Sequence, residues 1–434
     1  QNSAWEISEQ SQERDVDPLT LASLRKEISD VAGCPMVVQS NRSPFELAFC
    51  QRQDLQEIAL QGPATPDHVL RTKQKPMIGT EVIEYVGEYQ RYFEMHALNA
   101  RTPVEMLDPA PRVVLDPDLG MLSIGKSGRQ ANIVADIYRH TMGIIQRAEM
   151  LDQWQALSSQ EIFDVEYWEL EQAKLRKSGN SPAFQGEVAL ITGAASGIGK
   201  ASVNSMLQRG AAVVGLDRNP AITQQFPDQD YLGIQCDVTD TLALKQALFE
   251  TCLRFGGLDI LVLNAGIFPS GCTVASLDDA VWRQVMQVNL DANLALLRES
   301  HPYLKLAARG GRVVVIGSKN VPAPGQGAAA YSASKAALNQ LARIVALEWS
   351  NDNIRINSLH PDAVFDTGIW TTQVLETRAR HYDLSVEEYK KRNLLRCEIT
   401  SHDVAELTAE LCDQRFSKTT GAQIPIDGGN DRVI

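Results

Sequence analysis

Short apolar runs recur from residue 188 onward, separated by segments with helical spacing, and this alternation constrains the fold more than any other feature. The runs are apolar almost throughout, which is typical of strands covered on both faces of a sheet. Strands that alternate with helices predict an α/β domain with a Rossmann-type, doubly wound parallel sheet. The seven predicted strands are 188–192, 211–217, 231–236, 260–264, 312–317, 354–359 and 422–426.

The residues before 188 follow a different pattern. Apolar residues recur at helical spacing over 136–154 and over 158–177, which predicts two amphipathic helices. The second helix opens with a capping box, in which Ser158 and Glu161 each satisfy a backbone N–H of the other.

A boundary between the two patterns is expected in the segment SGNSPAF, residues 178–184. Gly, Asn, Ser and Pro occur together there, and such clusters are typical of loops between structured regions. We therefore predict two domains, a smaller α/β domain over 1–180 and the doubly wound domain over 185–434.

Charge and hydropathy exclude several classes of partner. The formal net charge is -13 and no block of five or six like charges occurs, so nucleic acid and anionic membranes are poor candidates. The longest apolar stretches, such as 259–268, fall short of the roughly 20 residues that a membrane-spanning helix needs. No membrane partner is therefore predicted.

The N-terminal sequence and the cysteines favour a cytoplasmic protein. The first residues show neither a signal-peptide pattern nor a transit-peptide pattern, and Gln1 stands where an initiator methionine would, as in a processed or truncated product. The seven cysteines are an odd number without C-x-x-C spacing, which predicts reduced, structural thiols.

The turn after the first strand of the second region carries three glycines within seven positions, in the pattern T-G-x-x-x-G-x-G. A helical run follows, so the N–H groups and the positive end of the helix dipole face the turn. Glycine lets a pyrophosphate lie against the backbone without a Cβ in the way. By itself the pattern also fits a glycine-rich turn without a ligand. The candidate dinucleotide-binding residues are Gly193, Ser196, Gly197, Ile198 and Gly199.

Asp217 ends the next predicted strand and bears on the choice of cofactor. A carboxylate there can accept hydrogen bonds from a ribose diol and would repel a 2′-phosphate, which favours NAD over NADP. Arg218 follows directly and could favour the phosphate instead. However, no basic residue occurs over 194–196 to hold a phosphate, so NAD is predicted, with Asp217 and Arg218 as candidate contacts.

Motifs further along the chain occur in an order that resembles the short-chain dehydrogenase/reductase family. These are TGAASGIG, CDV (236–238), NAG (264–266), VNL (288–290), Ser318, YSASK (331–335) and TGAQIPIDGG (420–429). The resemblance covers about 186–430 and implies a catalytic tetrad at four matching positions. The tetrad residues are Asn289, Ser318, Tyr331 and Lys335. In the family, the positions matching Asp237 and Val238 lie against the adenine, and those matching Asn264, Ala265 and Gly266 back the cofactor.

The tetrad residues also make chemical sense by themselves. Tyr331 and Lys335 are four residues apart, so on a helix they share a face. An ammonium near a phenol lowers the phenol's pKa from about 10 toward neutrality, which prepares a base for an alcohol proton. We expect the Ser318 hydroxyl to hold the substrate oxygen, and Asn289 to keep a water in line for proton relay from Lys335.

The segment HPDAVFDTGIW, from His360 to Trp370, departs from the family pattern. The family usually has Pro-Gly here, whereas this chain has Pro361 followed by Asp362. We predict that this segment, including Pro361, contacts the nicotinamide and caps the substrate, as loops in this place generally do. Its polar and aromatic residues favour a small hydroxylated substrate. Removal of Trp370 is predicted to raise the KM for polyols or hydroxyaldehydes.

The first region resembles the later part of a class II aldolase/adducin-type domain over 61–77 and 111–175. The whole chain resembles the C-terminal two thirds of bifunctional rhamnulose-1-phosphate aldolase/short-chain dehydrogenase proteins, which implies lactaldehyde or a related sugar-derived alcohol as substrate. Such aldolases bind a divalent metal through an H-x-H pair and a later histidine, which His68 would match. No H-x-H pair occurs among the seven histidines, so no metal site is predicted.

Together these features predict an NAD-dependent oxidoreductase that acts on a small alcohol or hydroxyaldehyde, with Tyr331 as general acid and base. Two alternatives remain open from the sequence. The first is a metal-dependent lyase activity of the N-terminal region, and the second is an NAD-binding module without catalysis. A homo-oligomer, dimer or tetramer, is expected through the helices that carry Asn289 and Tyr331.

Overall fold

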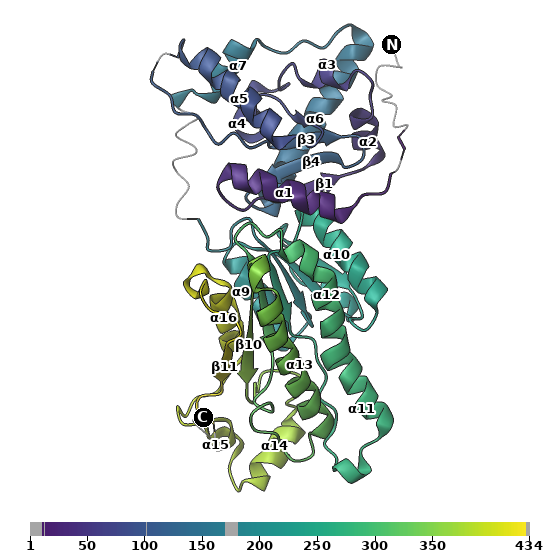
Figure 1. Ribbon diagram of the computed structural model, residues 1–434, viewed down its shortest axis with the longest axis vertical. Helices are drawn as coiled ribbons and strands as arrows, with labels where there is room; N and C mark the ends of the chain where they lie inside the picture. Colours follow the sequence, from purple (N-terminus) through teal and green to yellow (C-terminus); the bar gives the residue numbers. More distant parts are fainter. Residues whose placement is uncertain (1–10, 13, 101, 170–180, 431–434) are drawn as a thin grey trace. The chain divides into compact units, whose positions relative to one another are not determined.

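The computed structural model describes residues 11–12, 14–100, 102–169 and 181–430 (Figure 1). The chain forms two compact units, each with its own β-sheet. Unit 1 comprises Gln1–Glu187 and Cys252–Gly257, and unit 2 comprises Val188–Thr251 and Leu258–Ile434. The predicted domain limits fall within or beside 170–180, which lies outside the described residues, and they stay predictions.

The sheet of unit 1 has four strands in the order β1-β4-β3-β2. Their bounds are β1 Val37–Asn41, β2 Met77–Ile78, β3 Val113–Asp116 and β4 Gly120–Gly125. The pairs β1/β4 and β3/β4 are antiparallel, and β2/β3 is parallel. The helical elements of this unit are α1 Pro18–Ala32, α2 Pro44–Cys50, α3 Leu55–Ala59, η2 Pro66–His68, α4 Val69–Thr72, α5 Val82–Ala97, α6 Gly128–Leu151 and α7 Ser159–Glu166.

Successive side chains of β3 pack in two different hydrophobic clusters. Val113 and Leu115 pack in one buried cluster with residues of α6, such as Tyr138. Val114, between them in the sequence, belongs to a second cluster with residues of α1 and α5, such as Leu24. Since successive side chains of a strand point to opposite faces, the sheet is covered by helices on both sides.

The two helices predicted in unit 1 are present with different limits. The helix predicted over 136–154 is α6, which begins earlier, at Gly128, because Ser127 caps its N-terminus by accepting a hydrogen bond from the N–H of Gln130. The capping box at Ser158 is confirmed. The helix that it starts ends at Glu166, so the prediction of one continuous helix over 158–177 was wrong at Tyr167 and Trp168. Residues 170–177 lie outside the described residues.

The sheet of unit 2 confirms the predicted doubly wound fold. Its order is β11-β10-β9-β8-β5-β6-β7, and every neighbouring pair of strands is parallel. All seven predicted strands are present, with limits that differ by at most two residues. Their bounds are β5 Val188–Thr192, β6 Ala212–Asp217, β7 Tyr231–Gln235, β8 Ile260–Leu263, β9 Gly311–Ile316, β10 Ile354–Pro361 and β11 Gln423–Ile426.

The strand order reverses at β5, which pairs with β6 on one side and with β8 on the other. Loops at the carboxyl ends of β5 and β8 therefore lead away to opposite faces, which leaves the crevice where open α/β sheets bind ligands. The described α-helices and the π-helical segment of this unit are α9 Gly197–Gln208, α10 Thr241–Phe255, α11 Asp279–Met286, η5 Gln287–Asp291, α12 Ala292–Leu304, α13 Ala329–Glu348, α14 Thr372–His381, α15 Val386–Lys390 and α16 Ser401–Cys412. The last residues of α10, from Cys252 on, belong to unit 1.

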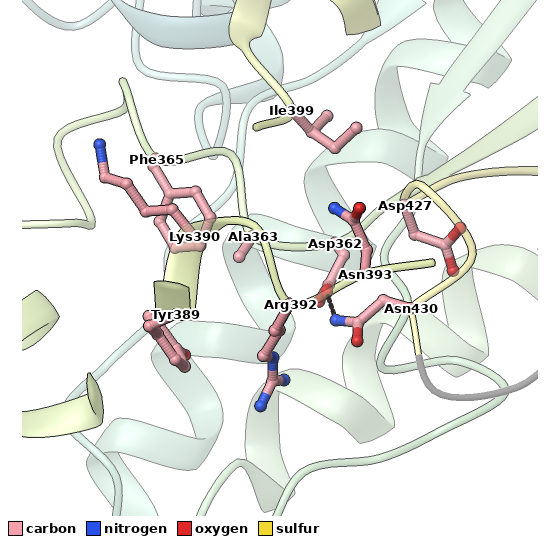
Figure 2. Close-up of a pocket in the computed structure, with 10 residues that line it drawn as sticks. All are labelled: Asp362, Ala363, Phe365, Tyr389, Lys390, Arg392, Asn393, Ile399, Asp427 and Asn430. Atoms are coloured by element: carbon pink, nitrogen blue, oxygen red, sulfur yellow. Dashed lines mark hydrogen bonds between the residues drawn. The ribbon is translucent and has the colours of Figure 1, made fainter. Parts of the chain in front are cut away.

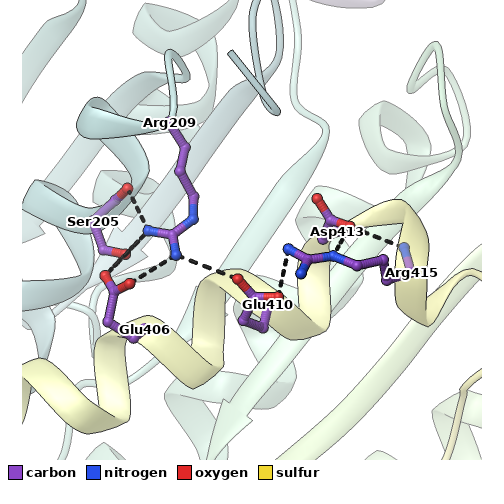
Figure 3. A network of polar contacts seen from close by, with 6 residues as sticks. All are labelled: Ser205, Arg209, Glu406, Glu410, Asp413 and Arg415. Atoms are coloured by element: carbon purple, nitrogen blue, oxygen red, sulfur yellow. Dashed lines mark hydrogen bonds and ion pairs between the residues drawn. The ribbon is translucent and has the colours of Figure 1, made fainter.

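A polar network joins α9, which follows the glycine turn, to α16 (Figure 3). The Arg209 guanidinium donates to both carboxylate oxygens of Glu406, at 3.1 Å and 2.7 Å, and lies 3.4 Å from Glu410. The hydroxyl of Ser205 donates to Glu406 at 2.7 Å. These hydrogen bonds, led by those from Arg209, lower the pKa of Glu406 to about 2.

Glu406→Gln is expected to lower the Tm by about 2–4 °C at pH 7, because a network near the surface contributes about 1 kcal/mol after solvent screening. A carboxylate whose pKa is lowered by folding contributes its full stabilisation at pH values above its ordinary pKa. This stabilisation is lost as the pH falls toward the lowered pKa. The Tm difference should therefore persist down to about pH 4.5 and shrink toward pH 2.

Thermal unfolding of both proteins between pH 2 and 7 measures this difference. The matched control is Glu376→Gln, which removes an exposed ion pair of 3.9 Å with Arg380 and should leave the Tm unchanged. A Tm gap for Glu406→Gln that stays the same at every pH would contradict the role given to its charge.

Candidate active site

The glycine turn lies between the end of β5 and the start of α9, as predicted. Gly193 and Gly197 have φ angles of 65° and 51°, in the left-handed region that favours glycine. Ser196 is the N-cap of α9, but its side chain makes no capping hydrogen bond. The first N–H groups of the helix therefore lack the usual side-chain partner and are suited to an anion.

Close packing explains two of the glycines. A Cβ on Gly193 would lie 2.9 Å from the side-chain nitrogen of Asn264, and a Cβ on Gly199 would lie 2.1 Å from the carbonyl oxygen of Gly193. Neither distance is compatible with a side chain. The turn can therefore approach both the helix and the NAG segment only with glycine at these positions.

Thr192, at the end of β5, ties the NAG segment to this turn. Its hydroxyl accepts hydrogen bonds from the backbone N–H groups of Asn264 and Ala265, both at 3.0 Å. The side-chain amide of Asn264 donates in return to the carbonyl oxygens of Thr192, at 2.8 Å, and Gly193, at 3.2 Å. The two predicted cofactor segments, from the ends of β5 and β8, are thus brought together.

Asp217 reaches the same turn from the end of β6. Its carboxylate accepts hydrogen bonds from the N–H of Ala195 at 3.0 Å and from the N–H of Asn219 at 2.9 Å. Its oxygens retain acceptor capacity for a further donor such as a diol. Arg218 is exposed beside it.

Asp237 and Val238 follow β7, the neighbouring strand. Asp237 is exposed, and hydrogen bonds from the backbone and side chain of Thr239 lower its pKa. Val238 is half-buried beside it. Both residues follow the strand that pairs with β6, so they lie at the same edge of the sheet as Asp217.

Asn289 is fully buried in the π-helical segment between α11 and α12. Its side chain accepts from the N–H of Ile267 at 2.8 Å and donates to the carbonyl oxygen of Ile267 at 3.0 Å. It also donates to the hydroxyl of Ser334 at 3.1 Å. Asn289 therefore connects the loop after β8 to α13, the helix that carries Tyr331 and Lys335.

Tyr331 and Lys335 lie on one face of α13. The Lys335 ammonium is 5.9 Å from the centre of the Tyr331 ring and donates to the carbonyl oxygen of Ile316 at 2.8 Å. A Cβ on Gly266 would lie 3.3 Å from the Asn289 oxygen and 3.5 Å from the Lys335 nitrogen. The structure thus brings these predicted residues together at the carboxyl edge of the sheet.

The pKa values in this site differ from the sequence prediction. Burial raises the pKa of the Tyr331 phenol, and a hydrogen bond with Ser318 acts in the opposite direction. Burial also lowers the pKa of Lys335 to about 8. The predicted lowering of the phenol's pKa by Lys335 was therefore wrong for this structure, because burial is the largest influence on the phenol and Ser318, not Lys335, acts against it.

Ser318 follows β9 and is buried. Its neighbours are Asn320, which the sequence prediction missed, and His360, the first residue of the predicted loop segment. The backbone N–H of Asn320 donates to its hydroxyl at 3.1 Å, and the side-chain amide of Asn320 does so at 3.4 Å. The ring nitrogen Nδ1 of His360 lies 3.0 Å from the carbonyl oxygen of Ser318, and Nε2 lies 2.7 Å from the side-chain oxygen of Gln423. The signal in the sequence for Asn320 was its position two residues after the serine.

The loop after β10 holds the residue that departs from the family pattern. Asp362 accepts a hydrogen bond from Asn430 and lies 3.4 Å from the Lys319 ammonium. The backbone N–H of Lys319 donates to the carbonyl oxygen of Pro361 at 2.9 Å. Asp362 therefore fastens this loop to the residue after Ser318, a role that glycine could not serve.

A small pocket lies below this loop (Figure 2). It is lined by residues from the loop, from α15, from the segment after α15 and from the end of the described chain, including Asp362, Phe365, Tyr389, Arg392, Asn393 and Asn430. Trp370 packs against Phe365 and Tyr389, with ring centres 4.9 Å and 6.3 Å apart. Its indole is thus partly buried in the apolar cluster that packs the loop against α14 and α15.

In unit 1, His68 is exposed, and its Nδ1 lies 2.8 Å from the hydroxyl of Thr65. Within residues 11–12, 14–100, 102–169 and 181–430, no group of three or more His, Cys, Asp or Glu side chains could hold a metal ion. Across the same ranges, no helix is long and apolar enough to cross a bilayer.

Comparison with known proteins identifies both regions. Residues 187–377 match the family model for short chain dehydrogenases. The cis-4-hydroxycyclohexanecarboxylate dehydrogenase of Sinomonas cyclohexanicum is 33% identical to 58% of this chain, and the match covers 99% of that enzyme. The chain belongs to the short-chain dehydrogenase family. A dehydrogenase/reductase of this fold from Sinorhizobium meliloti 1021 superimposes with a TM-score of 0.51 at 30% identity, over 58% of this chain and 98% of its own.

The remainder of this short-chain dehydrogenase also has relatives. Residues 15–175 match the second domain of class II aldolases. The uncharacterized oxidoreductase YuxG of Bacillus subtilis is 34% identical over 399 residues, which is 85% of this chain. The chain spans 57% of the length of YuxG, and the aldolase-like region is part of what the two share.

Gly199→Ala tests the packing of the turn. A Cβ that lies 2.1 Å from the Gly193 carbonyl should lower the free energy of unfolding by about 1–3 kcal/mol, the usual range for overpacking. Urea unfolding measures this loss. Gly368→Ala is the matched control, since nothing lies within 4 Å of its added Cβ, and equal stability of the two variants would argue against the constraint.

Proposed function

We propose that unit 2 is an NAD-dependent oxidoreductase that transfers a hydride between nicotinamide and a small alcohol or hydroxyaldehyde. The observation that carries this proposal is the convergence of Tyr331, Ser318, Lys335 and Asn289 beside a glycine turn whose helix N-terminus is uncapped by side chains. A dinucleotide-binding module without catalysis would need the turn but not these four residues.

The residues around the turn fit NAD. The N–H groups at the start of α9 suit the pyrophosphate, and the glycines leave room for it. Asp217 suits the ribose diol, and its negative charge disfavours the 2′-phosphate of NADP. The residues proposed to hold NAD are Gly193, Ser196, Gly197, Ile198, Gly199, Asp217, Arg218, Asp237, Val238, Asn264, Ala265, Gly266, Tyr331, Lys335 and Pro361.

The chain supplies the route for the proton. In the oxidation direction the Tyr331 oxygen, as the phenolate, takes the proton of the alcohol O–H, and the carbon that bears this hydroxyl gives up a hydride and becomes a carbonyl carbon. In the reverse direction the neutral phenol returns the proton. NAD, when bound, supplies the hydride acceptor. Ser318 donates a hydrogen bond to the oxygen on which negative charge develops. The Lys335 ammonium lies near the ring of Tyr331. Asn289 connects the loop after β8 to α13, and a relay water would lie between that loop and that helix.

A small hydroxylated substrate is favoured over a large one. The Phe268 ring lies 4.7 Å from the Tyr331 ring, and the loop after β10 is fastened by Asp362, so the space beside the phenol is limited. The relative from Sinomonas cyclohexanicum is named for a hydroxylated ring acid. We propose lactaldehyde or a sugar-derived alcohol of similar size.

We also propose a cytoplasmic homo-oligomer. All seven cysteines are free, which suits a reducing compartment. Large apolar side chains are exposed on neighbouring helices of unit 2: Trp282 on α11 is 38% exposed, Leu294 on α12 45%, and Leu347 on α13 79%. A second copy of the chain would bury these side chains.

Tyr331→Phe is expected to lower kcat by about 100- to 10,000-fold, because the variant lacks the group that exchanges the proton. NADH binding should remain, since the ring and Lys335 are retained. The measurement is NADH absorbance in a screen of lactaldehyde, small diols and sugar alcohols, together with NADH fluorescence for binding. A fully active variant would overturn the assignment of Tyr331.

Asp217→Ala tests the choice of cofactor. Loss of hydrogen bonds to a charged group should raise the KM for NAD about tenfold or more, and removal of the repulsion should lower the KM for NADP. The ratio of kcat/KM for the two cofactors is the measurement. A wild-type protein that prefers NADP, or a variant with an unchanged ratio, would contradict NAD specificity.

A further inference from the structure

The hydroxyl oxygen of Ser318 has two hydrogen-bond donors near it, and both belong to Asn320. The backbone N–H and the side-chain amide of Asn320 both donate to its oxygen, at 3.1 Å and 3.4 Å. A serine hydroxyl can accept two hydrogen bonds and donate one. With both acceptor positions used by Asn320, the remaining capacity of Ser318 is its own proton.

The orientation of the Asn320 amide follows from its other partners. Its oxygen accepts from the backbone N–H of Gly325 at 2.9 Å and from the hydroxyl of Ser332 at 3.2 Å. A backbone N–H can only donate, so the oxygen must face Gly325. The NH₂ group must then face Ser318, and the alternative flip of the amide would place two donors against each other.

The network also reaches the helix of the catalytic tyrosine. Ser332 directly follows Tyr331 in α13, so Asn320 bridges the end of β9 and the start of that helix. A hydrogen bond between Ser318 and Tyr331 opposes the effect of burial on the pKa of the phenol. Since Asn320 occupies both acceptor positions of the serine, the Ser318 hydroxyl can only be the donor in that bond.

We infer that Asn320 is a positioning residue that directs the Ser318 proton toward Tyr331 and the reacting oxygen, by occupying both acceptor positions of the serine. This inference rests on the proposed function. Without Asn320 the serine could rotate and donate its proton to a backbone carbonyl instead. Its stabilisation of the developing negative charge would then be lost, although Ser318 itself is unchanged.

A double-mutant cycle with Ser318→Ala, Asn320→Ala and the combined variant tests this role. If Asn320 acts through the serine, Asn320→Ala should lower kcat about tenfold in the wild-type background and less than about twofold in the Ser318→Ala background. The KM for NAD should stay within about twofold, because Asn320 lies outside the proposed cofactor contacts. A loss of kcat that is equal in both backgrounds would overturn the inference.

Asn320→Asp separates positioning from folding. The aspartate keeps oxygen acceptors for Gly325 and Ser332 but lacks the NH₂ donor, and its carboxylate would attract the serine proton away from the reacting oxygen. We expect a wild-type Tm and a kcat at least about tenfold lower. Asn351→Asp, at an exposed position after α13, is the matched control for the added charge and should keep the wild-type kcat.

The outcomes distinguish this inference from the function on which it rests. A wild-type protein that reduces NAD with an alcohol, together with an Asn320→Asp variant of equal kcat, would overturn the role of Asn320 alone. A wild-type protein that binds NADH but oxidises none of the alcohols in the screen would overturn the proposed function and, with it, this inference.

Discussion

The hydrogen bonds of Thr192 underlie the whole site. The residue ends β5 at the centre of a parallel sheet, and its hydroxyl and carbonyl bind the segment that follows β8. These bonds require β5 and β8 to be neighbours, as they are at the point where the strand order reverses. They bring the glycine turn so close to Asn264 that Gly193 and Gly199 have no room for a Cβ.

The other elements of the site are connected by side-chain amides rather than by charged groups. Asn264 joins β5 to the loop after β8, Asn289 joins that loop to α13, and Asn320 joins the end of β9 to the same helix. An amide both donates and accepts, so each one can connect two backbones at fixed orientations. Burial then acts on the ionisable residues between them. It raises the pKa of Tyr331 and lowers that of Lys335, which favours the neutral form of both, and Ser318 opposes this effect on the phenol.

Unit 1 uses buried ionisable groups in a different way. Tyr89 and Tyr92 donate to the carboxylate of Glu166 at 2.8 Å and 3.2 Å, and burial raises the pKa of that carboxyl. The ammonium of Lys73 lies 4.2 Å from the centre of the Tyr89 ring and donates to the carbonyl oxygen of Asp108, and burial lowers its pKa to about 8. This cluster connects α5 and α7 with Lys73, the residue that ends α4, so its polar groups position these helices relative to one another.

The sequence by itself determined the sheet of unit 2 and predicted the members of the proposed site. Strands that are buried on both faces can be recognised from the sequence, because each is a continuous stretch of apolar residues. Tyr331 and Lys335 are four residues apart, so helix geometry places them on one face. Tertiary structure alone decided the rest. The pKa of Tyr331 depends on how deeply its neighbours bury it. The roles of Asn320 and Asp362 depend on contacts with Ser318, Ser332 and Asn430, which lie on other elements. Such contacts leave no periodic pattern in the chain, since they are set by the packing of segments that are distant in sequence.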